Sequence, residues 1–139
     1  MNKQTIHYIN TLSNKTKRTL HSFSIDGEFS STEGRTLHFI LAHTGDLFQK
    51  DIEEEFDIRP STATQLLQRM EKDGLIVRET AEHDARLKRI VATPKAISYQ
   101  NQVSTNLSIL EKTLTSGIAP EKLKVFYEVV DQILENLDK

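Results

Sequence analysis

The sequence contains no cysteine, which excludes disulfide bonds, thiolate metal sites and thiol-based redox switches. It has no apolar run close to the roughly 20 residues that a transmembrane helix needs. Its first residues lack the apolar core of a signal peptide, and it has neither a Gly-rich phosphate loop nor a Gly-x-Ser-x-Gly motif. We therefore expect a cytoplasmic protein that has no membrane contact, is not an enzyme and uses no cofactor.

Length and composition favour one soluble globular domain, since the chain has 139 residues, of which 37% are hydrophobic and 27% are charged. The histidines raise the question of a metal site. None of their spacings resembles a zinc motif, and His38 and His43 do not share one face of a helix. We expect no metal site among His7, His21, His38, His43 and His83.

Residues 49–94 have the pattern of a short helix, a tight turn, a second helix, and two strands joined by a charged loop. The second helix is predicted to begin at Pro60, because proline suits the first helical position, and to end at Gly74. Arg59 stands where a capping Ser, Asp or Thr is usual, so one backbone N–H lacks its usual acceptor. Apolar spacings of three and four define the face to be buried: Ala63, Leu66, Leu67 and Met70.

The opposite face of this second helix carries short or fork-shaped hydrogen-bonding side chains. A helix that reads base edges in a DNA major groove needs such groups near its N-terminal turns. The alternative is a solvated face without a partner. The candidate DNA-binding residues here, with Gln49 from the preceding helix, are Gln49, Arg59, Pro60, Ser61, Thr62, Thr64, Gln65, Gln68 and Arg69.

Two short runs rich in branched residues, 75–79 and 89–93, are predicted strands, and the charged residues 80–88 between them are predicted to form a solvent-exposed hairpin tip. Cations on such a tip can meet phosphates or enter a narrow minor groove. Asp84 could orient the Arg86 guanidinium; a weak surface ion pair is the alternative. The candidate DNA-binding residues here are Asp84, Arg86, Lys88 and Arg89. This order of elements is a winged helix-turn-helix, which predicts duplex DNA as the target.

The net charge of −2 is unusual for a DNA-binding protein, but the charge is unevenly distributed. Residues 59–95 hold eight Lys or Arg and five Asp or Glu, a net charge of +3. Residues 46–57 hold six acidic residues and only Lys50 as a cation. We expect this acidic helix to face away from phosphate.

Two helices are expected before residue 49. The first covers residues 3–24 and is ended by Asp26-Gly27. The second is capped by Ser30 or Ser31, with Glu33 in its first turn.

One helix is expected after Pro94, up to Ser116-Gly117, and a last helix begins at 119–121. The terminal helices carry apolar stripes so broad that a partner must cover them. A two-fold dimer would do so, and would set two recognition helices about one helical turn of DNA apart. The candidate dimerisation residues are Ile6, Ile9, Leu110, Leu114, Leu123, Phe126, Val130, Ile133, Leu134 and Leu137.

The sequence resembles the MarR family of bacterial transcriptional regulators, most strongly over residues 47–96. The residues that carry the resemblance are Asp51-Ile52, Ser61-Thr62-Ala63-Thr64, Glu71, Gly74, Leu75, Ile76, Arg78, Asp84 and Arg86. The resemblance implies one domain over residues 1–139 that forms an obligate homodimer. Its winged helix-turn-helix lobe would be residues 30–94, and its helical dimerisation region residues 1–28 and 95–139.

Two functions are compatible with these patterns. The first is a dimeric, sequence-specific regulator of transcription that binds a pseudo-palindromic operator in double-stranded DNA. The resemblance implies a repressor that is released when a small-molecule effector binds between the dimerisation helices and the winged lobe, although no motif marks the effector pocket. The second is a winged-helix module that binds another protein and no DNA. The acidic helix would suit such a role. A salt-dependent DNA titration distinguishes them. The fold class expected in both cases is mainly α with a small β-hairpin wing.

Overall fold

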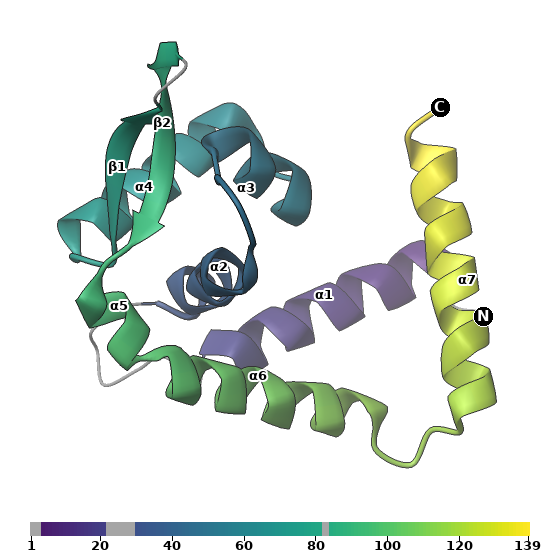
Figure 1. Cartoon of the computed structure of the whole chain (residues 1–139). Coiled ribbons are helices and arrows are strands. Elements are labelled where there is room, and N and C mark those ends of the chain that lie inside the picture. The colour runs from purple at the N-terminus through teal and green to yellow at the C-terminus, as the bar shows by residue number, and fades with distance from the viewer. Residues whose placement is uncertain (1–3, 22–29, 82–83) are drawn as a thin grey trace. The chain divides into compact units, whose positions relative to one another are not determined.

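The structure is a computed structural model that describes residues 4–21, 30–81 and 84–139 (Figure 1). Two compact units are present, Met1–Leu107 and Ser108–Lys139. In chain order the elements are α1 (Thr5–His21), α2 (Ser31–Ala42), α3 (Gln49–Phe56), α4 (Pro60–Lys72), β1 (Ile76–Ala81), β2 (Asp84–Ala92), α5 (Pro94–Ser98), α6 (Gln100–Thr115) and α7 (Pro120–Leu137). The predicted fold class, mainly helical with one β-hairpin, is confirmed.

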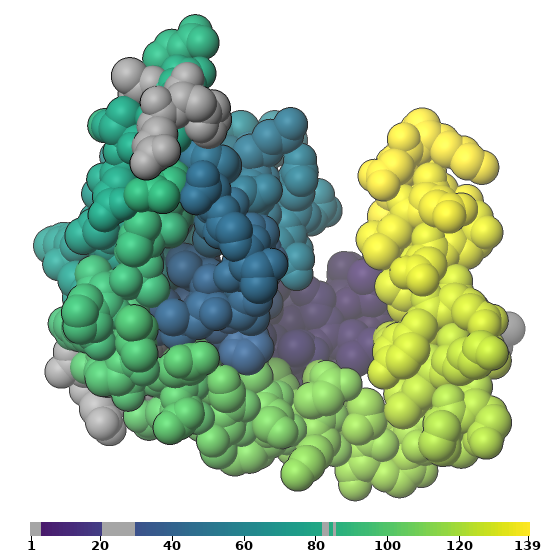
Figure 2. Space-filling view, viewed as in Figure 1, coloured from purple at the N-terminus to yellow at the C-terminus, as the bar shows by residue number. Residues whose placement is uncertain are grey.

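The first unit is built around the predicted second helix of the winged segment, α4. The four apolar residues of α4 are buried, as their spacing predicts. Leu66, Leu67 and Met70 pack in one core with side chains from α2, α3 and both strands, which include Leu37, Ile52, Ile76 and Ile90. The end of the hairpin stands clear of these helices (Figures 1 and 2). The core therefore fixes the buried side of α4 and leaves the other side open.

The capping residue of α2 is Ser30, one of the two serines that the sequence allowed. Ser30 Oγ accepts a hydrogen bond from the backbone N–H of Glu33 at 3.2 Å, and the Glu33 carboxylate accepts one from the N–H of Ser30 at 3.3 Å. This reciprocal pair is a capping box. The predicted stop of the helix before it, at Asp26-Gly27, lies outside the described residues.

Both predicted ends of α4 are confirmed. Pro60 is its first residue, and Arg59 at the N-cap makes no side-chain capping bond. Gly74 has a φ of +76°, a conformation that glycine adopts without strain. Beyond it, Thr93 Oγ1 donates to the Gly74 carbonyl at 2.6 Å and Lys95 Nζ donates to the Asp73 carbonyl at 2.9 Å. The C-terminus of α4 is thus held by residues from the start of α5.

Two predicted boundaries are wrong. Most of residues 80–88 belongs to the strands, because Thr80 pairs with Lys88 in the antiparallel register. Backbone pairing needs no apolar side chains, so a charged segment can continue the ladder. The single helix expected after Pro94 is divided into α5 and α6 at Tyr99, whose N–H bonds to the carbonyl of Ala96 in a tight turn. Ile97 of α5 is 53% exposed.

In the second unit, α7 begins at Pro120 as predicted and has no buried residue. Its apolar side chains include Phe126, Leu134 and Leu137, all exposed. A helix with so much exposed apolar surface needs a partner to cover it. No helix among the described residues is both long enough and apolar enough to cross a membrane.

Glu33 is a buried carboxyl group, only 2% exposed. Its Oε2 has no hydrogen-bond donor. Burial, and next a hydrogen bond with the Asp73 carboxyl, raise the pKa of Glu33 above its ordinary value.

We expect Glu33→Gln to change how stability depends on pH. Because the pKa of Glu33 is higher in the folded state, its contribution is fully present below about pH 4.5, the ordinary pKa, and is lost as pH rises through the folded-state value. The measurement is urea unfolding across this pH range at fixed protein concentration. The difference in free energy of unfolding between variant and wild type should be constant at low pH and then move in favour of the variant. Parallel curves over the whole range would contradict this assignment.

Candidate nucleic-acid interface

The turn between α3 and α4 brings the two helices together over very few residues. Asp57 ends α3 in the left-handed conformation, with a φ of +50°, which aspartate tolerates better than most residues. The N–H of Ile58 then bonds to the Glu53 carbonyl at 3.1 Å. This compact turn places α4 directly against α3, as a helix-turn-helix requires.

Gln49 and Thr64, both predicted to contact DNA, are hydrogen-bonded to each other. Gln49 Nε2 donates to Thr64 Oγ1 at 3.0 Å and lies 3.2 Å from the carbonyl oxygen of Pro60. Thr64 Oγ1 donates to the same carbonyl at 2.9 Å. These bonds fasten the start of α3 to the first turn of α4, so both residues position the helix whether or not they also touch DNA.

The remaining polar residues of α4 share an open face. Their side chains are exposed, and this face lies opposite the buried apolar one. Hydroxyl, amide and guanidinium groups on a rigid helix can bond both base edges and phosphates. The exposed predicted residues are Arg59, Pro60, Ser61, Thr62, Gln65, Gln68 and Arg69.

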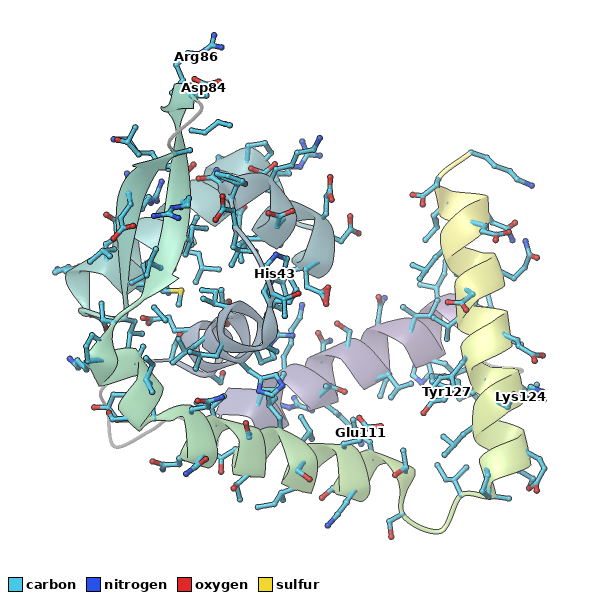
Figure 3. The ribbon with its side chains drawn as sticks, in the orientation of Figure 1. His43, Asp84, Arg86, Glu111, Lys124 and Tyr127 are labelled. Atoms are coloured by element: carbon cyan, nitrogen blue, oxygen red, sulfur yellow. The ribbon has the colours of Figure 1, made fainter. Side chains whose placement is uncertain are left out.

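Asp84 and Arg86 lie at the far end of the hairpin, as Figure 3 shows. Arg86 Nε is 3.2 Å from Asp84 Oδ1, and the terminal Nη2 is 3.3 Å from Oδ2. The predicted orientation of the guanidinium by Asp84 is therefore present in the structure. The Arg86 side chain is still 91% exposed, so it remains accessible to a ligand.

A pocket of about 230 Å³ lies between the start of α3 and the hairpin. Four cationic side chains and no carboxylate line it. The first backbone N–H groups of a helix have no intrahelical acceptors and favour anions. The lining residues are Phe48, Gln49, Lys50, Arg78, Arg86, Leu87, Lys88 and Ile90. Such a pocket suits a phosphate group.

Lys50 and Arg78 are absent from the predicted DNA-binding set. Arg78 Nε is 3.0 Å from Glu71 Oε1, so this cation is partly balanced by a carboxylate of α4. Lys50 could have been noticed, because it is the single cation in the acidic segment and lies in the first turn of the predicted helix.

Arg89 was predicted to act with Arg86 and Lys88, but it lies on the other face of the hairpin. Side chains alternate along a strand, so Arg89 projects from the face opposite to its neighbour Lys88. Arg86 and Lys88 both line the pocket beside α3, and Arg89 does not. There Arg89 is paired with carboxylates, and its hydrogen bonds with Glu79, and next with Asp46, raise the pKa of its guanidinium.

The predicted dimerisation residues differ in exposure. Leu110 is buried, and the rest are half-buried or exposed. The exposed ones are Ile6, Ile9, Leu114, Phe126, Leu134 and Leu137. Among the residues that the structure describes, no three His, Asp or Glu side chains gather in a way that could hold a metal ion.

Comparison with known proteins agrees with this geometry. A family model described as the MarR family matches residues 29–87. The transcription regulator MarR from Oenococcus oeni PSU-1 is 25% identical, with a TM-score of 0.83 over 95% of this chain and 99% of its own. The S. aureus MepR–DNA complex is 22% identical, with a TM-score of 0.89 over 97% of this chain and 99% of its own.

The PcaV transcriptional regulator from Streptomyces coelicolor, in complex with its natural ligand, is 15% identical, with a TM-score of 0.82 over 96% of this chain and 93% of its own. The family match spans α2 to α4, β1 and the start of β2, and the solved structures share the fold over nearly the whole chain. The family consists of transcription regulators, which confirms the prediction that the protein is not an enzyme. Residues 29–87 thus match the MarR family, and the chain as a whole has the winged-helix fold of these similar structures.

Proposed function

We propose that the protein is a homodimeric, sequence-specific DNA-binding repressor whose DNA affinity falls when a small molecule binds. The observation that carries this proposal is the combination, on one lobe, of an open polar face on α4 and a cation-lined pocket beside it. Gln49 connects the two, because it lines the pocket and is hydrogen-bonded to Thr64 of α4.

In this proposal α4 enters the major groove. Gln65, Gln68 and Arg69 are long enough to reach base edges, and Ser61 and Thr62 lie nearest the phosphates at the start of the helix. A backbone phosphate occupies the pocket between α3 and the hairpin. Arg86 extends from the hairpin to a neighbouring phosphate or into the minor groove.

Dimerisation follows from the exposed apolar face of α7. Burying that face against a second copy stabilises both helices and links two lobes in one molecule. Two copies of α4 can then read a pseudo-palindrome whose half-sites are about one helical turn apart. In this arrangement residues 1–28 and 95–139 make the dimer, and residues 30–94 make each DNA-binding lobe.

The similar proteins support both DNA and a small molecule as ligands in this proposal. The S. aureus MepR structure is a complex with DNA, and PcaV is bound to its natural ligand. Repression that is relieved by an effector requires only that the effector prefer a spacing of the recognition helices that does not fit DNA.

The test of the proposed function is selection of bound duplexes from a random DNA pool at near-physiological salt. A pseudo-palindromic motif with half-sites about one helical turn apart is the expected result. Weak binding without a motif, which disappears as salt rises, would contradict the proposal and favour a protein-interaction role for the acidic α3.

We expect Arg86→Ala to weaken binding to the selected operator and to lower the salt slope by about one unit, because one phosphate contact and its released counterion are lost. Fluorescence anisotropy titrations over a salt series measure both quantities. The matched control is Arg18→Ala, an exposed arginine of α1 outside the winged lobe, which should keep the wild-type slope. Unchanged affinity in Arg86→Ala would remove Arg86 from the interface.

We expect Ile133→Glu to dissociate the dimer and abolish operator binding, because a charge would be placed in the apolar face of α7. Sedimentation velocity measures the oligomeric state. Gln132→Glu is the control, since it adds the same charge at the neighbouring, exposed position on the polar side of the helix. A dimeric Ile133→Glu protein would exclude this part of α7 from the interface.

A further inference from the structure

The Arg89 guanidinium joins two separate segments of the first unit. One terminal nitrogen is 2.6 Å from Glu79 Oε2, on the paired strand β1. The other is 3.5 Å from Asp46 Oδ1, in the connection between α2 and α3. A guanidinium has a planar fork of donors, so it can bond two carboxylates at once, which a lysine ammonium does less well.

A backbone hydrogen bond lies directly beside this ion-pair cluster. The N–H of Ile90 donates to the carbonyl of Leu47 at 2.8 Å. Leu47 directly follows Asp46 in the sequence, and Ile90 directly follows Arg89. The side chains of Leu47 and Ile90 are both buried in the core. The segment before α3 is therefore attached to β2 by one backbone bond and by the Arg89 side chain.

We propose that Arg89 is a positioning residue for the wing: together with Asp46 and Glu79 it holds the hairpin against the segment that leads into α3. This attachment fixes the position of Arg86 relative to α4. The inference rests on the proposed DNA-binding function, and it assigns Arg89 a role in that function without contact with DNA.

Two possible roles for Arg89 predict opposite changes in DNA affinity when the charge of a carboxylate partner is removed. If Arg89 contacts a phosphate, then removing the Glu79 charge frees the guanidinium and takes a negative charge away from DNA, so binding becomes tighter. If Arg89 positions the wing, the same change loosens the hairpin and binding becomes weaker. The sign of the effect of Glu79→Gln therefore distinguishes the two roles.

The experiment compares wild type, Arg89→Ala and Glu79→Gln in titrations of the selected operator over a salt series. Both variants should bind about fivefold or more weakly, with the salt slope of wild type, because no phosphate contact is lost. Arg89→Lys should recover less than half of the lost affinity, since it keeps the charge but not the fork. The control is Glu54→Gln, which removes the same charge from exposed α3 and should not weaken binding.

A second measurement needs no DNA. Hydrogen exchange of the Ile90 amide should be faster in Arg89→Ala and Glu79→Gln than in wild type, and unchanged in Arg86→Ala and Glu54→Gln. Exchange that is unchanged in Arg89→Ala, or tighter DNA binding by Glu79→Gln, would overturn the proposal. If the wild type selects no DNA motif, the proposed function fails, while the exchange data still show whether Arg89 holds the wing.

Discussion

Helix α4 has to bury one face completely while the opposite face stays in water, and the first unit meets this requirement. Leu66, Leu67 and Met70 are buried, and truncating such a side chain to alanine typically costs about 2 to 5 kcal/mol. Rotation of α4 about its axis would expose these groups, so the core fixes which polar side chains point outward. The hydrogen bonds of Gln49 and the Gly74 turn then fix the two ends. A DNA-reading surface needs this rigidity, because base contacts depend on the placement of a few atoms.

The bounds of α4 could be predicted because they follow from local backbone rules at Pro60 and Gly74. The length of the hairpin could not, because its outer part has charged residues and no apolar alternation. For the same reason, Arg89 was grouped with Arg86 and Lys88 on the hairpin tip. Once Lys88 is known to lie in the strand, the two-residue alternation separates Arg89 from Lys88. Contacts between distant positions, such as Gln49 with Thr64, leave no periodic signal in one sequence.

The distribution of charge explains how a chain with a net charge of −2 can bind DNA. Some cations of the positive segment are already balanced, since Arg78 is paired with Glu71, and Arg89 with Glu79 and Asp46. The attraction for phosphate therefore comes from fewer groups than the sequence count indicates. Four cations, Lys50, Arg78, Arg86 and Lys88, lie around one pocket, and local potential matters more than total charge. Exposed ion pairs contribute only about 0 to 1 kcal/mol each, so the paired cations matter mainly through the geometry they impose.

A single lobe with so few unpaired cations would bind DNA weakly and would lose that binding as salt increases. Joining two lobes changes this, because binding of the first lobe raises the effective concentration of the second at its half-site. The gain depends on a dimer interface rigid enough to hold the lobes at the right spacing. The apolar face of α7 can supply such an interface, since none of its residues is buried within one chain. Helix packing in the dimer and affinity for DNA are then coupled, and a ligand that alters the spacing of the lobes acts on both.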